Sequence, residues 1–139
     1  IGWSGFLVPQ VAKEYGFTAA AFTRGIVWSV WHYPMIIAGI YRNESPLWFN
    51  LVCFTIVLTG TSFIYIWFRL KSGSLWTGMF LHASHNTFIQ SFFTRITGAT
   101  AITAYFIDEF GAALAFISIV LAYVFWRKRL SLQLGIPSK

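Results

Sequence analysis

The stretch Trp28-Ser29-Val30-Trp31-His32-Tyr33-Pro34 lies late in an apolar run from about Phe17 to Ile40. A run of about 20 apolar residues is long enough for a helix to cross a bilayer. A charge inside such a run costs about 2.5–3.5 kcal/mol on insertion scales, so His32 is a candidate functional residue. Trp28 lies one helical turn before His32, where its ring is expected to shield the imidazole from lipid. The alternative is a histidine that only hydrogen-bonds a neighbouring helix.

The composition of the whole chain indicates a membrane protein. Of its 139 residues, 57% are hydrophobic and 10% are charged, whereas an ordinary soluble domain has about 25% charged residues. The formal charge of +6 comes from basic residues at the ends of apolar runs and not from a stripe, so we expect membrane lipids and no nucleic acid as partners. Cys53 is the single cysteine and lies within a span, which excludes an internal disulfide.

Hydropathy predicts an all-α fold, a polytopic transmembrane helix bundle that forms one domain over residues 1–139. Ile1 to about Val11 is too short to span a membrane, so we expect the end of a truncated N-terminal helix in the C-terminal part of a longer protein. The four predicted spans are Phe17 to Ile40, about Leu47 to Phe68, about Ser74 to Phe93, and Phe110 to Trp126.

Other segments of the chain also allow structural predictions. A polar turn, Lys13-Glu14-Tyr15-Gly16, precedes the first span, and residues 130–139 form a polar tail. The small residues Thr59-Gly60-Thr61-Ser62 of the second span predict close helix packing. The mixed stretch that ends at Asp108-Glu109 is expected to lie at the membrane interface.

Charge placement predicts the topology. The positive-inside rule assigns the more basic side of the bundle, with the C-terminus, to the cytoplasm. Arg24 is the exception because it lies inside the first span, where it either snorkels toward the basic side or pairs with an acid outside this chain. The basic side carries Lys13, Arg69, Lys71, Arg127, Lys128, Arg129 and Lys139.

The third span contains a second group of polar residues. His82 and Asn86 are four residues apart and therefore share one helix face, and His85 borders it. At about 1.5 Å per residue, His32 lies roughly 24 Å from the turn before its span, and Asn86 lies roughly 20 Å from the turn before its own. Similar depth predicts that these side chains converge on one buried pocket. The alternative is a set of interhelical hydrogen bonds without chemistry.

The residue types in such a pocket determine which reactions it could support. Two imidazoles, His32 and His82, and the carboxamide of Asn86 can bind a divalent metal or a water and stabilise an oxyanion. No aspartate or glutamate occurs inside a complete span, so a hydrolase needs a carboxylate from outside this chain. Ser84 adjoins His82 on a different face, which disfavours a serine nucleophile.

Three segments together resemble a known family. Ile1-Gly-Trp-Ser-Gly-Phe-Leu-Val-Pro-Gln10, Trp28-Ser-Val-Trp-His32 and Leu81-His-Ala-Ser-His-Asn86 are similar to the three motifs of the CPBP (Abi) family. These are intramembrane proteases related to type II CAAX prenyl endopeptidases and bacteriocin-processing proteins. The family pattern is Glu-Glu-x-x-x-Arg, aromatic-x-x-x-His and His-x-x-x-Asn/Asp, in this order.

The resemblance implies site residues and a mechanism. His32, His82 and Asn86 take the catalytic positions, and His85 has no family role. A glutamate and His32 activate the attacking water, while His82 and Asn86 orient it and stabilise the oxyanion. A divalent metal such as zinc, held by His32 and His82, is the alternative means of activation. The substrate is then a membrane-associated or prenylated peptide, and the location is the cell membrane of a bacterium.

Two departures from the family pattern affect the function. The glutamate pair falls directly before Ile1, so this chain alone is expected to be inactive, and the family arginine is replaced by Ser4. The leading hypothesis is an intramembrane metalloendopeptidase. The first alternative is a non-catalytic membrane scaffold acting in bacteriocin immunity or partner binding. A transporter or channel, in which histidine and asparagine relay protons, is the other alternative.

Overall fold

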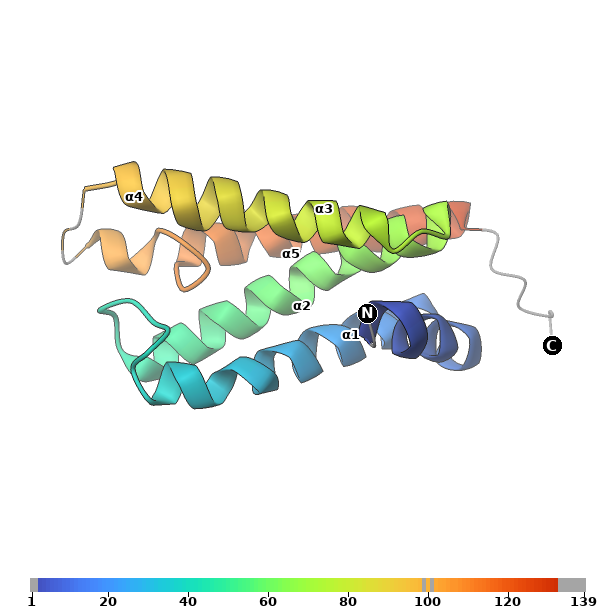
Figure 1. Cartoon of the computed structure of the whole chain (residues 1–139), viewed down its shortest axis with the longest axis horizontal. Helices are drawn as coiled ribbons and strands as arrows, with labels where there is room; N and C mark the ends of the chain where they lie inside the picture. Colours follow the sequence, from blue (N-terminus) through green and yellow to red (C-terminus); the bar gives the residue numbers. More distant parts are fainter. Residues whose placement is uncertain (1–2, 99, 101, 133–139) are drawn as a thin grey trace.

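The computed structural model describes residues 3–98, 100 and 102–132, with the side chains of Trp3 and Ser4 left out. Every regular element of this part of the chain is helical (Figure 1), which confirms the predicted all-α class. Residues 133–139 of the predicted polar tail lie outside the described residues, as does the Ser4 side chain. The elements are η1 (Trp3–Leu7), α1 (Val8–Ile37), α2 (Leu47–Ser72), α3 (Trp76–His85), η2 (Asn86–Phe93), α4 (Thr94–Ile96), η3 (Thr103–Tyr105), α5 (Ala112–Lys128) and η4 (Arg129–Ser131).

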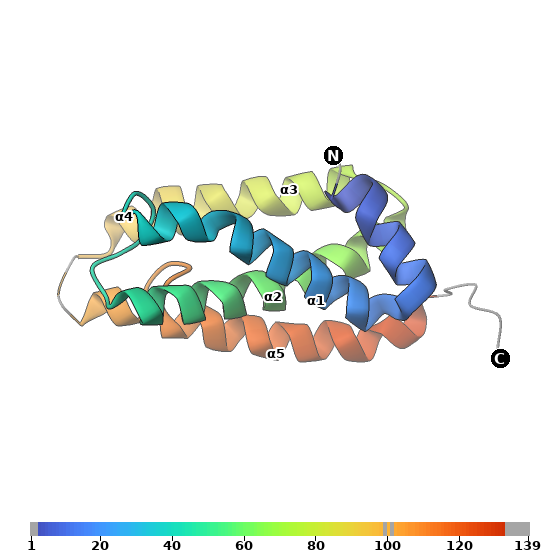
Figure 2. The ribbon, with the colours of Figure 1, turned by 90° about the horizontal axis from the view of Figure 1, so that it is seen from below.

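Helix α1 contains a sharp kink at Gly16, where φ is 85° and ψ is 172°. Positive φ favours glycine because it has no Cβ. The segment before the kink therefore turns across the end of the bundle, as Figure 2 shows in dark blue. The expected four-residue turn is wrong in extent, because residues 13–15 remain helical and Gly16 alone leaves helical geometry.

The remaining three long helical segments follow the predicted spans closely. α2 ends at Ser72, and Gly73 caps it in the left-handed conformation, with φ of 67°. α3, η2 and α4 continue one another from Trp76 to Ile96, and the π-helical turns of η2 begin at Asn86. Among the described helices, α2 is the one long and apolar enough to cross a membrane by length and composition.

Helix α2 is the centre of the bundle, because α1, α5 and α3 all pack against it. At one end, Phe17 of α1 meets Phe63 of α2 edge to face, with ring centroids 5.8 Å apart. At the other end, Phe54 of α2 stacks on Phe110, with centroids 5.3 Å apart. Burial of these aromatic rings holds both ends of the bundle together.

Small residues allow the helix axes to approach closely along α2. A Cβ added to Gly25 of α1 would stand 2.5 Å from the Cα of Thr59. A Cβ added to Gly60 would stand 2.7 Å from the carbonyl oxygen of Ser118 in α5. The predicted packing role of the small patch in the second span is therefore confirmed, and it serves two interfaces at once.

The two loops at the far end of the bundle are joined by hydrogen bonds. Asn43 donates from its side chain to the carbonyl oxygen of Ala104 at 2.7 Å. Asn50, in the first turn of α2, donates to the carbonyl oxygen of Ser45 at 2.8 Å and accepts from the Asn43 backbone at 3.2 Å. The loop before α2 and the segment before α5 therefore hold each other in place, next to the pocket described below.

A tight turn precedes α5. Asp108 has a φ of 55°, and its carboxylate accepts a hydrogen bond from the Phe110 backbone at 2.8 Å. A Cβ on Gly111 would collide with backbone atoms of Phe106 and Ile107, so the turn requires glycine there. Burial raises the pKa of Asp108 to about 6, although the hydrogen bond from Phe110 opposes this shift.

We expect Gly25→Ala and Gly60→Ala each to lower the free energy of unfolding by about 1–3 kcal/mol, because the added methyl group forces packed helices apart. Thermal unfolding of the purified protein in detergent measures the effect. Gly78→Ala is the matched control, since its Cβ would stand 3.8 Å from Tyr65, an ordinary contact. An unchanged melting temperature in both test variants would contradict the packing argument.

Asp108 predicts a pH dependence of stability. Its folded pKa lies above the ordinary value, so the folded state binds more protons than the unfolded state between about pH 4 and pH 6. Stability contributed by this group therefore falls as pH rises through that window. Asp108→Asn should raise the melting temperature at pH 7.5 relative to the unmodified protein, and this difference should disappear near pH 4. A constant difference across the range would exclude Asp108 as its source.

Candidate functional site

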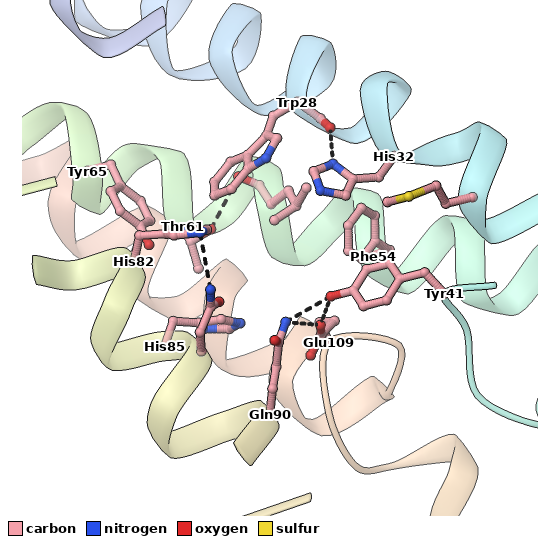
Figure 3. Close-up of a pocket in the computed structure, with 13 residues that line it drawn as sticks. Trp28, His32, Tyr41, Phe54, Thr61, Tyr65, His82, His85, Gln90 and Glu109 are labelled. Carbon is pink, nitrogen blue, oxygen red and sulfur yellow. Dashed lines mark hydrogen bonds between the residues drawn. The ribbon is translucent and has the colours of Figure 1, made fainter. Parts of the chain in front are cut away.

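A pocket of about 270 Å³ lies between α1, α2 and the helix formed by α3 and η2 (Figure 3). The three predicted site residues, His32, His82 and Asn86, all line it, although they come from helices far apart in the sequence. His85 lines the same pocket, whereas Ser84 does not. The expectation of convergence is therefore met, and the catalytic roles of these residues stay predictions. The other lining residues are Trp28, Met35, Tyr41, Phe54, Leu58, Thr61, Tyr65, Gln90 and Glu109.

His32 is oriented by its own helix. Its Nδ1 atom lies 2.8 Å from the carbonyl oxygen of Trp28, one turn earlier. A carbonyl only accepts hydrogen bonds, so Nδ1 carries the proton and Nε2 of the neutral ring keeps its lone pair. The ring also lies 5.4 Å from Phe54 and 6.1 Å from Tyr41 between centroids. This histidine is therefore presented as a proton acceptor.

The indole of Trp28 connects the two histidines. Its centroid is 6.1 Å from that of His32 and 5.3 Å from that of His82 (Figure 3). The expectation that Trp28 covers His32 is met, and the same ring also contacts the histidine of the opposite helix. Trp28 thus forms a common apolar wall for both imidazoles.

His82 and Asn86 lie one turn apart, as expected. Asn86 Nδ2 and His82 Nε2 are 3.3 Å apart and form a hydrogen bond. A carboxamide has two N–H groups, so one remains after this contact. Asn86 is also the first residue of the π-helical segment η2, and single-turn π-helical insertions are frequent at functional sites.

Arg24 borders the pocket from behind Trp28. Its guanidinium lies 4.4 Å from the ring centroid of Trp28 and 4.3 Å from that of Tyr65, and it donates to Ser62 Oγ at 2.8 Å. The sequence left open whether Arg24 snorkels or pairs with an acid. Within the described residues, two aromatic faces and a hydroxyl group hold it inside the bundle, so it does not snorkel. Pairing with an acid outside this chain stays a prediction.

Sequence reasoning missed a carboxylate in this pocket. Glu109 was expected at the membrane interface, yet its side chain is 3% exposed and lines the pocket. Its Oε1 accepts hydrogen bonds from the Tyr41 hydroxyl and from Gln90 Nε2, the latter at 2.5 Å. This chain therefore places a carboxylate in the pocket, whereas the need for a catalytic carboxylate from outside the chain stays a prediction. The one local signal was an acidic pair directly before an apolar helix.

Neighbouring residues explain the position of Glu109. Phe110, next in the chain, is buried against Phe54 and Tyr41, so the backbone at residue 109 is drawn toward the pocket. Gln90 also donates to the Tyr41 hydroxyl at 2.8 Å. Burial raises the pKa of Tyr41 well above its usual range, and the nearby Glu109 adds to this shift. Tyr41 therefore stays protonated and donates its hydrogen bond to the carboxylate.

The described part of the chain supplies fewer ligands than a catalytic zinc ion usually has. A catalytic zinc ion is usually held by three protein ligands. No group of three or more histidine, cysteine, aspartate or glutamate side chains that could hold a metal occurs among residues 3–98, 100 and 102–132. His32 and His82 would supply two ligands, and a third would have to come from elsewhere. A divalent metal held by His32 and His82 therefore stays a prediction.

Comparisons with known proteins cover the part of the chain that contains the predicted site residues. A family model described as "Type II CAAX prenyl endopeptidase Rce1-like" matches residues 1–88, which include His32, His82 and Asn86. CAAX prenyl protease 2 from Methanococcus maripaludis is 30% identical over 76 residues, which is 52% of this chain and 28% of that protein. The chain thus matches less than a third of the length of this curated relative. No solved structure gives a significant match.

Proposed function

This chain belongs to the type II CAAX prenyl endopeptidase Rce1-like family, and on that basis we propose that it carries much of the active site of an intramembrane endopeptidase. The observation that supports this proposal most strongly is the single pocket shared by His32, His82 and Asn86. The substrate in this proposal is a membrane-associated peptide with a prenylated cysteine, as the name of the archaeal relative suggests. Activity is proposed for the whole protein, not for this chain alone.

The proposed reaction is hydrolysis of a peptide bond by an activated water. His32 Nε2, with a glutamate that we expect directly before Ile1, takes a proton as the water oxygen attacks the scissile carbonyl carbon. His82 and the remaining Asn86 N–H group stabilise the oxygen of the tetrahedral intermediate. The carbon–nitrogen bond then breaks, and the proton passes to the leaving amine.

We also propose a multi-pass topology with a cytoplasmic C-terminus. α2 and α5 end on the same side of the bundle (Figure 1) and carry Arg69, Lys71, Arg127 and Lys128 in their last turns. Lys128 Nζ lies 5.8 Å from the ring of Trp67, and Arg129 stacks on Trp126 at 3.8 Å. Basic side chains beside tryptophan rings are typical of the interface on the cytoplasmic side.

A non-catalytic scaffold is the second candidate function. It is favoured by Ser4, which stands where the resembled family has an arginine. Such a protein would keep the pocket but would not hydrolyse a peptide bond. Activity measurements on the full-length protein separate the two candidates.

We expect His32→Ala and Asn86→Ala to lower kcat for a prenylated peptide by about 10²–10³-fold or more, because each removes a group that acts on the transition state. The measurement is cleavage of fluorogenic prenylated peptides by the full-length protein in detergent. Ser84→Ala is the matched control, since Ser84 is two residues after His82 but does not line the pocket. Full activity in both folded test variants would show that the site is wrong. No cleavage by the folded unmodified protein would favour the scaffold.

Removal of metal distinguishes the two ways of activating the water. We expect cleavage to survive 1,10-phenanthroline, because in the proposed reaction His32 and a glutamate activate the water without a metal. Cleavage rates before and after chelation, with the zinc content determined by elemental analysis, give the answer. Loss of activity that added zinc restores would instead support a metal held by His32 and His82.

A further inference from the structure

Glu109 has a carboxylate oxygen without a partner. Oε1 accepts two hydrogen bonds, whereas Oε2 is buried and has no hydrogen-bond partner. The side chain is 3% exposed and lines the pocket that contains His32 and His82. A buried acceptor that is left unsatisfied is unfavourable. The pocket therefore needs a donor that the described residues do not provide.

Two donors engage one oxygen of the Glu109 carboxyl group. Tyr41 and Gln90 both donate to Oε1. Gln90 also donates to the Tyr41 hydroxyl at 2.8 Å, so the two donors contact each other as well as Oε1. The arrangement holds one carboxylate oxygen and leaves the other without a donor.

Among the described residues, no lysine or arginine lines this pocket. Its titratable groups other than Glu109 are three histidines and two tyrosines. Arg24, close behind Trp28, is engaged by Ser62 and two aromatic rings. A buried carboxylate interacts most strongly with a cation, since the low dielectric of the interior strengthens the attraction. A positively charged side chain is therefore the donor that suits Oε2 best.

We propose that Oε2 of Glu109 binds a lysine or arginine side chain of the substrate peptide and so determines sequence specificity beside the scissile bond. This inference rests on the proposed endopeptidase function. An endopeptidase cuts an internal bond, so the cation belongs to a side chain and not to the peptide's amino terminus. Figure 3 shows Glu109, Gln90 and Tyr41 on one side of the pocket and Trp28 with His82 on the other.

This separation assigns different tasks to the two sides of the pocket. His32, His82 and Asn86 surround the carbonyl that reacts, whereas Glu109 holds a flanking side chain. Fixing the peptide at a second point aligns the scissile bond with the attacking water. Glu109 is thus a specificity-determining residue and not the general base.

The test uses the full-length protein and fluorescent prenylated peptides that carry one lysine, at successive positions on both sides of the cysteine. Each peptide has a partner in which norleucine replaces the lysine, a change that removes the charge and keeps the aliphatic chain. Equilibrium binding is measured on the Asn86→Ala protein, where cleavage is suppressed, and kcat and KM are measured on the unmodified protein. Both are repeated with Glu109→Gln, and with Glu44→Gln as control because Glu44 is exposed.

We expect the lysine peptide to bind at least about tenfold more tightly than its norleucine partner at one position. Glu109→Gln should abolish that preference and act through KM, and Glu44→Gln should keep it. If no position shows a preference, or if it persists in a folded Glu109→Gln protein, the inference is overturned. The comparison of peptides on unmodified protein remains decisive if Glu109→Gln fails to fold.

Binding and cleavage also separate this inference from the proposed function. A lysine preference that depends on Glu109, without any cleavage, supports the cation site and contradicts the endopeptidase. Cleavage without a lysine preference supports the endopeptidase and contradicts the cation site. An equal loss of kcat for all peptides in Glu109→Gln would assign the carboxylate to the chemical step and overturn a role in specificity.

Discussion

The close approach of α1 and α5 to the small-residue face of α2 is the constraint on which the rest of the structure depends. Gly25 lies against Thr59, and Gly60 lies against the backbone of Ser118, with no room for a Cβ at either glycine. Larger residues would separate the axes and with them the residues that each helix contributes. Trp28 and His32 follow Gly25 on α1 within two turns, so this contact sets their distance from α2.

The pocket exists because α3 is packed less closely against the bundle than α1, α2 and α5 are. α3 has no buried residue, and its contacts are mainly with α2. The space between α1 and α3 is therefore lined by aromatic and polar side chains. Trp28 reaches across it and contacts His82. A tightly packed core would satisfy every polar group, whereas this one leaves His32 Nε2 and Glu109 Oε2 facing shared space.

Two ionisable side chains of opposite kind, Arg24 and Glu109, belong to this region and are held in different ways. Arg24 is satisfied by aromatic faces and a hydroxyl group. Glu109 is only half satisfied, by Tyr41 and Gln90. A peptide that binds there would be oriented by charge as well as by shape.

The sequence by itself determined the helical class, the approximate helix bounds, the kink glycine and the shared face of His82 and Asn86, because hydropathy and helical periodicity are local properties. The similar depths predicted for His32 and Asn86 also indicated that His32 lies near that face. The tertiary structure alone decided the position of Glu109, which depends on contacts between segments far apart in the chain, such as Phe110 with Phe54 and Asn43 with Ala104. It also decided the partners of Arg24, since a cation within an apolar run has several possible neighbours until the helices pack.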